Sequence, residues 1–321
     1  YLIGKGKMSN SDLKPAYLEK IYSDIKLARP IRVAIDCGNG AASVCAEELY
    51  KGIGAQVESL FCNIDGNFPN HHPDPSNLKN LVSLQEALLK GESELGLAFD
   101  GDGDRLGVVT KKGEIIFPDR QLLLFAEDVL KKNPGASIIF DVKSTRHLFS
   151  WIEDRGGIPI IWKTGHSLIK AKMKESKAIL AGEMSGHMFF NDRWYGFDDG
   201  IYAGARLIEI LSHFDNPSEI LEALPKSFST PELNIKLKEG EQHRIIKALQ
   251  DEAKFQNAIE IIKIDGLRVE YDYGFGLMRA SNTTPVIVLR FEANSNKNLK
   301  LIQNDFKEIL GNYIPQGKIL F

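Results

Sequence analysis

The chain has 321 residues, of which 43% are hydrophobic and 26% are charged, and its formal net charge is −3 at pH 7. This balance is typical of a soluble globular protein with room for two or three domains. It argues against a general nucleic-acid-binding surface, and no apolar run approaches the roughly 20 residues of a membrane-spanning helix. We therefore expect no binding to nucleic acid or membranes, and we also expect a cytoplasmic protein that is a monomer.

The first part of the sequence is typical of a βαβ unit. A helix is predicted over 14–27, a strand over 31–35, a helix that ends near Tyr50, and a second strand over 56–61. The connections between these elements are short, which predicts a parallel sheet. A helix over 77–90 then leads to the apolar strand 95–99.

The same pattern returns further along. Strands are predicted over 137–140, 158–162 and 178–181, and helices over 146–155 and 167–176. Asp36 and Asp141 hold the same place in the two units, 105 positions apart. Each lies where a predicted strand ends and a turn begins. This weak internal repeat predicts two similar α/β domains whose loops face a common crevice.

The pattern changes from about Ser227. A strand is predicted over 233–237, a helix over 242–255, several strands interrupted by glycines, and a last helix over 297–310. These elements predict a smaller α+β domain with an antiparallel sheet. The expected division is a linker over 1–11, α/β domains over 12–114 and 115–226, and an α+β domain over 227–321.

Two groups of reactive side chains are interpreted as structural. Cys37, Cys45 and Cys62 are odd in number and flanked by apolar residues, which favours reduced core cysteines over a metal or redox site. His71 and His72 are adjacent, so they cannot both face one metal from a regular element.

The strongest chemical motif is Asp100-Gly101-Asp102-Gly103-Asp104-Arg105, which follows the strand 95–99. Three carboxylates in one turn repel one another unless a divalent cation lies among them, and Mg²⁺ or Ca²⁺ prefers such oxygen ligands. An EF-hand is excluded because Arg105 and Lys111 occupy its Gly and Glu positions. A polar surface turn is the alternative. Arg105 favours the metal site, since a cation and a guanidinium together neutralise a phosphoryl group.

Two further loops carry polar side chains at the ends of predicted strands. Glu183, Ser185 and His187 lie in the loop Gly182–His187, where they could bind sugar hydroxyls and move a proton. The loop Lys163–Ser167 opens a helix, so Lys163 and His166 could converge on an anion. An incidental polar turn is the alternative for the first loop, and N-capping for the second.

The loop Arg279–Pro285 offers many donors and no negative charge. Arg279, Ser281, Asn282 and Thr283 make it suitable for a phosphate, although a polar hairpin tip is the alternative. Lys143 lies in the turn equivalent to the Asp36 turn and could reach the same crevice.

We call the motif Asp100–Arg105 the metal loop. It is followed along the chain by the loops that begin at Lys163, Gly182 and Arg279. This set of four motifs, in this order, resembles the α-D-phosphohexomutases, and most closely their bacterial phosphomannomutase/phosphoglucomutase branch. The resemblance implies an isomerase that interconverts mannose or glucose 1-phosphates and 6-phosphates through a phosphoserine, with the hexose 1,6-bisphosphate as intermediate and activator. Mg²⁺ would be held by Asp100, Asp102 and Asp104. Arg105, His187, His166 and Lys143 would be catalytic, and Lys163, Glu183, Ser185, His187, Arg279, Ser281, Asn282 and Thr283 would bind the phosphosugar.

The phosphoserine loop of this family, normally Thr-Ala-Ser-His-Asn-Pro, is not found in the sequence. The chain is therefore expected to correspond to the last three of four domains and to lack mutase turnover by itself. Two other interpretations remain open from the sequence. One is a non-catalytic phosphosugar-binding protein, and the other is a Mg²⁺-dependent phosphatase with an Asp of the metal loop as nucleophile.

Overall fold

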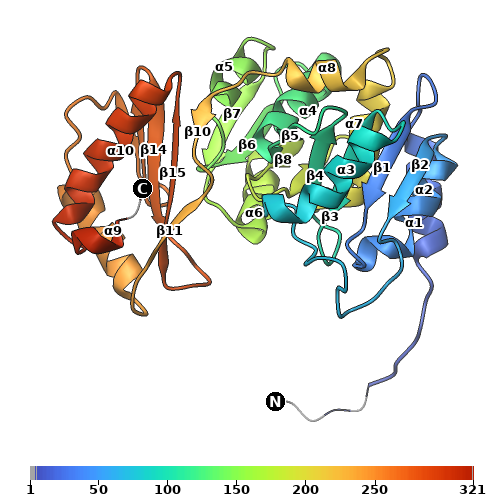
Figure 1. Ribbon diagram of the computed structural model, residues 1–321, viewed down its shortest axis with the longest axis horizontal. Helices are drawn as coiled ribbons and strands as arrows, with labels where there is room; N and C mark the ends of the chain where they lie inside the picture. Colours follow the sequence, from blue (N-terminus) through green and yellow to red (C-terminus); the bar gives the residue numbers. More distant parts are fainter. Residues whose placement is uncertain (1–3, 5, 320) are drawn as a thin grey trace. The chain divides into compact units, whose positions relative to one another are not determined.

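The computed structural model describes residues 4, 6–319 and 321, which fold into three sheets and their covering helices (Figure 1). The helices are α1 (Lys14–Asp24), α2 (Ala46–Gly52), α3 (Val82–Lys90), α4 (Pro118–Lys132), α5 (His147–Glu153), α6 (His166–Ser176), α7 (Gly200–Leu211), α8 (Pro217–Glu222), α9 (Glu241–Glu252) and α10 (Asn296–Gly311). The strands are β1 (Arg32–Asp36), β2 (Gln56–Leu60), β3 (Leu95–Phe99), β4 (Leu106–Thr110), β5 (Ile115–Ile116), β6 (Ser137–Asp141), β7 (Ile158–Trp162), β8 (Leu180–Gly182), β9 (Met188–Phe190), β10 (Phe228–Ser229), β11 (Leu233–Lys236), β12 (Glu260–Ile262), β13 (Leu267–Tyr271), β14 (Gly274–Ala280) and β15 (Val286–Ala293). The predicted mixed α/β class is confirmed.

The first sheet has the strand order β2-β1-β3-β4-β5. Strand β1 pairs in parallel with β2 and β3, as the βαβ pattern predicts, whereas β3 and β4 are antiparallel. Helix α3 packs Leu84 and Leu88 against Ala34 and Ala98 on one face. Because side chains alternate along a strand, Leu97 points to the opposite face, where α7 packs. Both faces are covered, which explains the unbroken apolar sequence of β3.

The second sheet repeats this arrangement with the order β7-β6-β8-β9. Strand β6 is parallel to β7 and β8, and β8 is antiparallel to β9. The internal repeat expected from Asp36 and Asp141 is thus present in the topology: β7-β6-β8-β9 correspond to β2-β1-β3-β4, and β5 has no counterpart in the second sheet. One consequence is that Asp100 after β3 and Glu183 after β8 occupy equivalent positions, each in a hairpin loop at the carboxyl end of a central strand.

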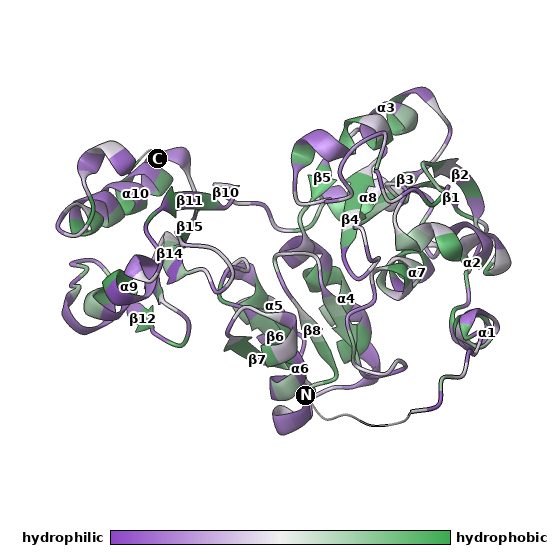
Figure 2. Cartoon of the chain, turned by 90° about the horizontal axis from the view of Figure 1, so that it is seen from below, coloured by the Kyte–Doolittle hydropathy of each residue, from purple (hydrophilic) through white to green (hydrophobic). Residues whose placement is uncertain are grey.

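The third sheet is antiparallel, with the order β10-β15-β14-β13-β12 and with β11 also paired to β15. Helices α9 and α10 cover one face through Leu249, Phe306 and Leu310. Figure 2 shows both helices with hydrophilic and hydrophobic bands, as expected for helices that bury only one side. On the other face, Phe275 and Leu277 pack against Val142, which follows β6.

The described chain forms two compact units. The first contains the residues up to Ile115 together with Gly200–Ile220, and the second contains Ile116–Asp199 and Leu221–Phe321. The segment Gly200–Ile220, expected within 115–226, therefore packs with the first sheet. The cause is α7, most of whose residues are buried. The Tyr50 hydroxyl of the first unit donates a hydrogen bond to the Ile201 carbonyl oxygen of α7 (2.8 Å).

Some predicted helix ends differ from the structure. The helix expected to reach residue 27 ends at Asp24, because Ile25 takes an extended backbone (ψ 130°). The helix expected between the turn Asp36–Gly40 and Tyr50 opens with a 3₁₀ turn over Ala41–Val44. None of the helices in the described part of the chain combines the length and the apolar character needed to cross a bilayer.

Candidate active site

The metal loop of the first unit is a closed turn built around Asp100. This side chain is 1% exposed; its Oδ1 accepts hydrogen bonds from the backbone N–H groups of Gly103 (3.1 Å) and Arg105 (3.0 Å), and its Oδ2 accepts one from Arg105 Nε (2.6 Å). Gly103 has φ 83°, a backbone that favours glycine. The turn brings the carboxylates of Asp100, Asp102 and Asp104 together, with one oxygen of each within 4.8 Å of the others.

These residues fit a divalent cation. Three carboxylates supply hard oxygen ligands, and Asp100 is already oriented by backbone donors. The three carboxylates lie close enough to repel one another, and a bound cation would offset this repulsion. Arg105 Nε lies 4.0 Å from Asp104 Oδ1. The turn can therefore hold a cation with a guanidinium beside it.

Neighbouring segments hold the metal loop in place. The Gly101 carbonyl accepts a hydrogen bond from Ala41 N–H (2.9 Å), and a Cβ added at Gly40 would lie 2.8 Å from the same oxygen. On the other side, Gly200 N–H at the start of α7 donates to the Gly103 carbonyl (3.1 Å). Only glycine at position 40 allows this close approach.

Arg105 is fixed from a second direction by the loop that contains the two adjacent histidines. Its Nη1 lies 3.2 Å from Asp74 Oδ1. In that loop His71 Nε2 lies 3.0 Å from Asp36 Oδ2, and His71 Nδ1 lies 3.0 Å from the His72 carbonyl oxygen. Burial raises the pKa of Asp36, and the neighbouring His71 opposes this shift. His71 is therefore a partner of Asp36 in the described fold, as the structural interpretation expects.

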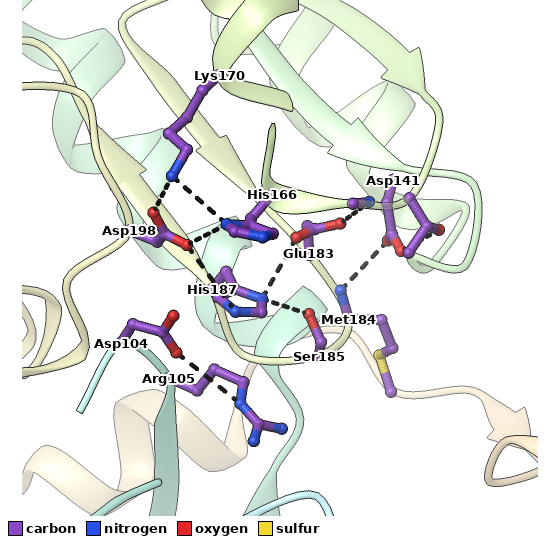
Figure 3. A network of polar contacts seen from close by, with 12 residues as sticks. Asp104, Arg105, Asp141, His166, Lys170, Glu183, Met184, Ser185, His187 and Asp198 are labelled. Atoms are coloured by element: carbon purple, nitrogen blue, oxygen red, sulfur yellow. Dashed lines mark hydrogen bonds and ion pairs between the residues drawn. The ribbon is translucent and has the colours of Figure 1, made fainter. Parts of the chain in front are cut away.

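In the second unit, Glu183 and His187 form the centre of a polar network (Figure 3). Glu183 is 2% exposed; its Oε1 accepts from Gly165 N–H (2.6 Å), and its Oε2 lies 3.3 Å from His187 Nδ1. The Ser185 hydroxyl lies 2.8 Å from the same nitrogen. Gly165 has φ 133°, so glycine is required where α6 begins. The contacts to Nδ1 orient the imidazole, and its Nε2 lies 3.9 Å from Asp198 Oδ2.

Asp141 connects three of the loops. It is fully buried; its Oδ1 accepts from Met184 N–H (3.2 Å) and the Ser144 hydroxyl (2.7 Å), and its Oδ2 accepts from the Thr164 hydroxyl (2.9 Å). The turn after β6, the loop before α6 and the loop after β8 are therefore held by one carboxylate. The repeat identified Asp141 in the sequence, but not this connecting role.

His166 is the first residue of α6, and its ring stacks on that of His187 with centroids 5.7 Å apart. His166 Nδ1 lies 3.3 Å from Asp198 Oδ2, and Lys170 Nζ lies 2.8 Å from Asp198 Oδ1. Burial of Asp198 acts to raise its pKa, but the hydrogen bond from Lys170, a backbone hydrogen bond and the charges of Lys170 and His187 together outweigh burial and hold the pKa below the usual range. Sequence reasoning missed Asp198 and Lys170; the spacing of Lys170 four residues after His166 is the signal that places both on one side of α6.

Lys163 and Asn282 line a hollow of about 330 Å³ in the second unit. Thr164, His243, Lys247 and Asp265 also line it, so that cationic side chains come from α9 as well as from the loop before α6. Asn282 and Thr283 are exposed at the hairpin tip between β14 and β15, whereas Ser281 is buried and lies 3.0 Å from the Thr284 hydroxyl. The hollow is suited to an anionic ligand.

Arg279 and Lys143 are both buried and both paired with a carboxylate. Arg279 Nε donates to Asp265 Oδ2 (3.0 Å), which also accepts from Thr164 N–H. Lys143 Nζ lies 2.6 Å from Glu232 Oε1, and the lysine is 5% exposed. The structure therefore brings Arg279 next to the Lys163 loop, whereas Lys143 is held by Glu232. Sequence reasoning missed Asp265 and Glu232: Asp265 lies 14 positions before Arg279 and outside its loop, and Glu232 lies 89 positions after Lys143.

Comparison with known proteins agrees with this fold. The chain matches the family described as phosphoglucomutase/phosphomannomutase, with its alpha/beta/alpha domain II over residues 15–113, its alpha/beta/alpha domain III over 117–228 and its C-terminal domain over 232–309. The chain belongs to the phosphoglucomutase/phosphomannomutase family.

Several relatives are similar over most of the chain. It is 61% identical over 307 residues to a phosphoglucomutase of Neisseria gonorrhoeae and 54% identical over 308 residues to a phosphomannomutase/phosphoglucomutase of Pseudomonas aeruginosa, with 95% and 96% of the chain covered. A crystal structure of a family member from Burkholderia thailandensis has a TM-score of 0.91 and 56% identity over 95% of the chain. The chain spans 67%, 66% and 65% of these three proteins, or about two thirds of their length. Both names denote isomerases.

Proposed function

We propose that residues 1–321 form the metal-binding, sugar-binding and phosphate-binding parts of a phosphohexomutase. This enzyme would interconvert hexose 1-phosphate and hexose 6-phosphate, with mannose and glucose as the sugars. The observation that carries the proposal is the arrangement of the metal loop, in which Asp100, Asp102 and Asp104 converge beside Arg105. Family membership and the names of the relatives support it.

In this proposal the metal loop prepares the site for phosphoryl transfer. Asp100, Asp102 and Asp104 would hold Mg²⁺, which would neutralise charge on the transferred phosphoryl group. Arg105 would contact the phosphoryl oxygens with its free guanidinium edge, while Asp100 and Asp74 fix the position of the side chain. The hydrogen bonds of Asp100 to the loop backbone keep these groups in position before substrate binds.

The loops of the second unit would recognise the sugar and the phosphate that is not transferred. Glu183 and Ser185 would bind hydroxyl groups that mannose and glucose share, and His187 would exchange a proton through Nε2. Lys163, Arg279, Ser281, Asn282 and Thr283 would bind the phosphate, with His166 beside them. Because Lys143 is paired with Glu232, its proposed contribution is to position the turn after β6 unless substrate displaces Glu232.

The hydroxyl that carries the transferred phosphoryl group is proposed to be a phosphoserine outside this sequence, and glucose or mannose 1,6-bisphosphate is the proposed intermediate. The phosphoserine loop of the family is not present in residues 1–321. We expect these residues alone to bind the bisphosphate and Mg²⁺ without turnover, because in-line transfer requires the donor to be positioned against the metal.

The test compares the chain with a fusion to the part of the Neisseria gonorrhoeae phosphoglucomutase that lies outside the match. With Mg²⁺, glucose 1,6-bisphosphate and either hexose 1-phosphate, the fusion should turn over on the order of 1–10³ s⁻¹ and the chain alone should not. Turnover by the chain alone would remove the need for an outside phosphoserine. A folded fusion that binds the bisphosphate without isomerising either sugar would contradict the mutase proposal.

A further inference from the structure

Cys37 and Cys62 lie in contact in the first unit, although the sequence analysis assigned all three cysteines to an inert core. Their Sγ atoms are 3.0 Å apart. This is about 1 Å longer than the 2.05 Å or so of a disulfide bond. The thiols are free, Cys37 is fully buried, and Cys62 is half-buried. A reagent from solvent can therefore reach one member of the pair more easily than the other.

The backbone fixes this contact. Asp36 at the end of β1 pairs with Leu60 at the end of β2, so Cys37 and Cys62 follow neighbouring parallel strands. Cys37 N–H donates to the Leu60 carbonyl (3.1 Å). Phe61 then takes φ 52°, a left-handed backbone that is uncommon for a residue with a side chain, and turns the chain directly after β2.

A second hydrogen bond fixes the other side of the pair, since Asn39 N–H donates to the Phe61 carbonyl (2.8 Å). The Asn39 side chain also donates to the Asn63 carbonyl (2.7 Å). The turn after β1 and the turn after β2 are thus bonded to each other on both sides of the two sulfurs. Little backbone movement is needed to bring the sulfurs within bonding distance.

The electrostatics distinguish the two thiols. The contact with Cys37, whose S–H can donate to a thiolate, lowers the pKa of Cys62. The same contact and burial raise the pKa of Cys37. A thiolate is the form that reacts with oxidants, and a buried thiol beside it is suited to resolve the product.

We propose that Cys37 and Cys62 are a redox modification site, in which Cys62 reacts with a peroxide and Cys37 closes a reversible disulfide. In the first step the Cys62 thiolate attacks one peroxide oxygen, and the product is a sulfenic acid and one water molecule after protonation. In the second step the sulfur of Cys37 loses its proton and attacks the Cys62 sulfur, whose hydroxyl leaves as a second water molecule. The pair gives up two electrons, and the peroxide takes them up.

This site has a direct connection to the metal loop. The turn that carries Cys37 ends at Gly40, whose N–H donates to the Cys37 carbonyl (2.8 Å), and the next residue, Ala41, donates to Gly101 (2.9 Å). Closing the disulfide moves Cys37 and therefore shifts the turn 37–41, which supports the Asp100 loop. We therefore infer that oxidation weakens Mg²⁺ binding; this second step rests on the proposed Mg²⁺ site, whereas disulfide formation does not.

The test uses residues 1–321 treated with hydrogen peroxide, followed by thiol blocking, digestion and mass spectrometry. The wild-type chain should give a Cys37–Cys62 linked peptide that dithiothreitol removes. Cys37→Ser should leave Cys62 as a sulfenic acid that dimedone traps, and Cys62→Ser should form no internal disulfide. Cys45→Ser is the matched control and should behave as the wild type, since Cys45 lies outside the pair.

Each outcome decides one part of the proposal. Oxidation of Cys45 at peroxide concentrations that leave Cys37 and Cys62 as free thiols would overturn it, as would a disulfide that joins Cys45 to Cys62. Titration with Mg²⁺ of the reduced and oxidised chain should show a Kd at least about threefold higher after oxidation, with recovery in dithiothreitol. A disulfide that forms without changing the Mg²⁺ Kd would confirm the modification site and overturn its link to the metal loop.

Discussion

Asp102 is the exposed member of the three carboxylates in the metal loop, whereas Asp100 is buried and Asp104 is half-buried. Replacing Asp102 with Asn removes one negative charge of the proposed Mg²⁺ site without disturbing the hydrogen bonds of Asp100 that close the turn. We expect Asp102→Asn to weaken Mg²⁺ binding about tenfold or more, which corresponds to about 1.4 kcal/mol, while the unfolding free energy without metal stays within about 0.5 kcal/mol. Calorimetric Mg²⁺ titration measures the first quantity and urea unfolding the second.

A matched control for this variant is Glu92→Gln, which removes the same charge from an exposed pair with Arg32 in the first unit. It should leave the Mg²⁺ Kd unchanged. Equal weakening by both variants would mean that the general charge of the surface, and not the loop, attracts the cation.

The ion pair between Lys170 and Asp198 predicts a pH dependence of stability. The pKa of Asp198 is lower in the folded state than in the unfolded state, so the native state binds fewer protons in the acidic range. The stabilisation is therefore fully present above the ordinary carboxyl pKa. It is lost as the pH falls through the folded pKa. Lys170→Met should reduce stability at pH 7 by about 0.5–1 kcal/mol, since Lys170 is partly exposed.

The difference between wild type and Lys170→Met should shrink as the pH is lowered from 5 toward 2, where the wild type loses this contribution. Urea unfolding at several pH values measures it, and Lys174→Met, on the same helix, is the control. A difference that stays constant over this range would show that Asp198 does not respond to Lys170.

At the scale of single elements, α7 depends on a close approach to α2 and β3. A Cβ added at Gly204 would lie 2.2 Å from the Tyr50 hydroxyl oxygen and 3.1 Å from a Leu97 methyl carbon. In an exposed helix a Gly to Ala change stabilises by about 0.5–1 kcal/mol. Here we expect Gly204→Ala to destabilise by about 1–3 kcal/mol, because the added methyl group must push packed side chains apart.

Urea unfolding checks this expectation, with Gly311→Ala as the control. Gly311 ends α10, and nothing lies within 4 Å of its added Cβ. An unfolding free energy for Gly204→Ala equal to or above that of the wild type would contradict the packing of α7 on the first sheet.

The elements show how far sequence reasoning can reach. Local patterns were sufficient for β3, β6 and the repeat, because apolar runs followed by Gly-rich turns predict strands directly. They also predicted the metal loop, since its three carboxylates lie within one turn. The position of α7 could not be predicted in this way. Its sequence shows only that it is apolar, and the sheet it covers is specified by contacts such as that of Tyr50 with Ile201, 151 positions away.

The candidate site has the same limit. Glu183, His187 and Arg279 were predicted from their own loops, but their partners Gly165 and Asp265 were not. Gly165 comes from the loop before α6, and Asp265 precedes β13, so only the fold brings them close. The Cys37–Cys62 contact was missed for the same reason: the two cysteines are 25 positions apart and meet only because β1 and β2 are parallel neighbours.

For the whole molecule, the division into two units separates the proposed ligands. The metal loop belongs to the first unit, and the loops that begin at Lys163, Gly182 and Arg279 belong to the second. Each ligand should therefore stabilise mainly the unit that binds it, by about 2.7 kcal/mol at a free concentration 100 times its Kd. Hydrogen–deuterium exchange followed by mass spectrometry can assign this protection to peptides.

We expect Mg²⁺ alone to slow exchange of the Gly103 and Arg105 amides, which already bond to Asp100, and EDTA to reverse the effect. Glucose 1,6-bisphosphate without metal should instead slow exchange in the loops of the second unit, and Arg279→Met should abolish that protection. Because Arg279 lies in the second unit, this variant should leave the Mg²⁺ effect intact. Protection of the second unit by Mg²⁺ in the absence of sugar would show that the cation binds elsewhere than the Asp100 loop.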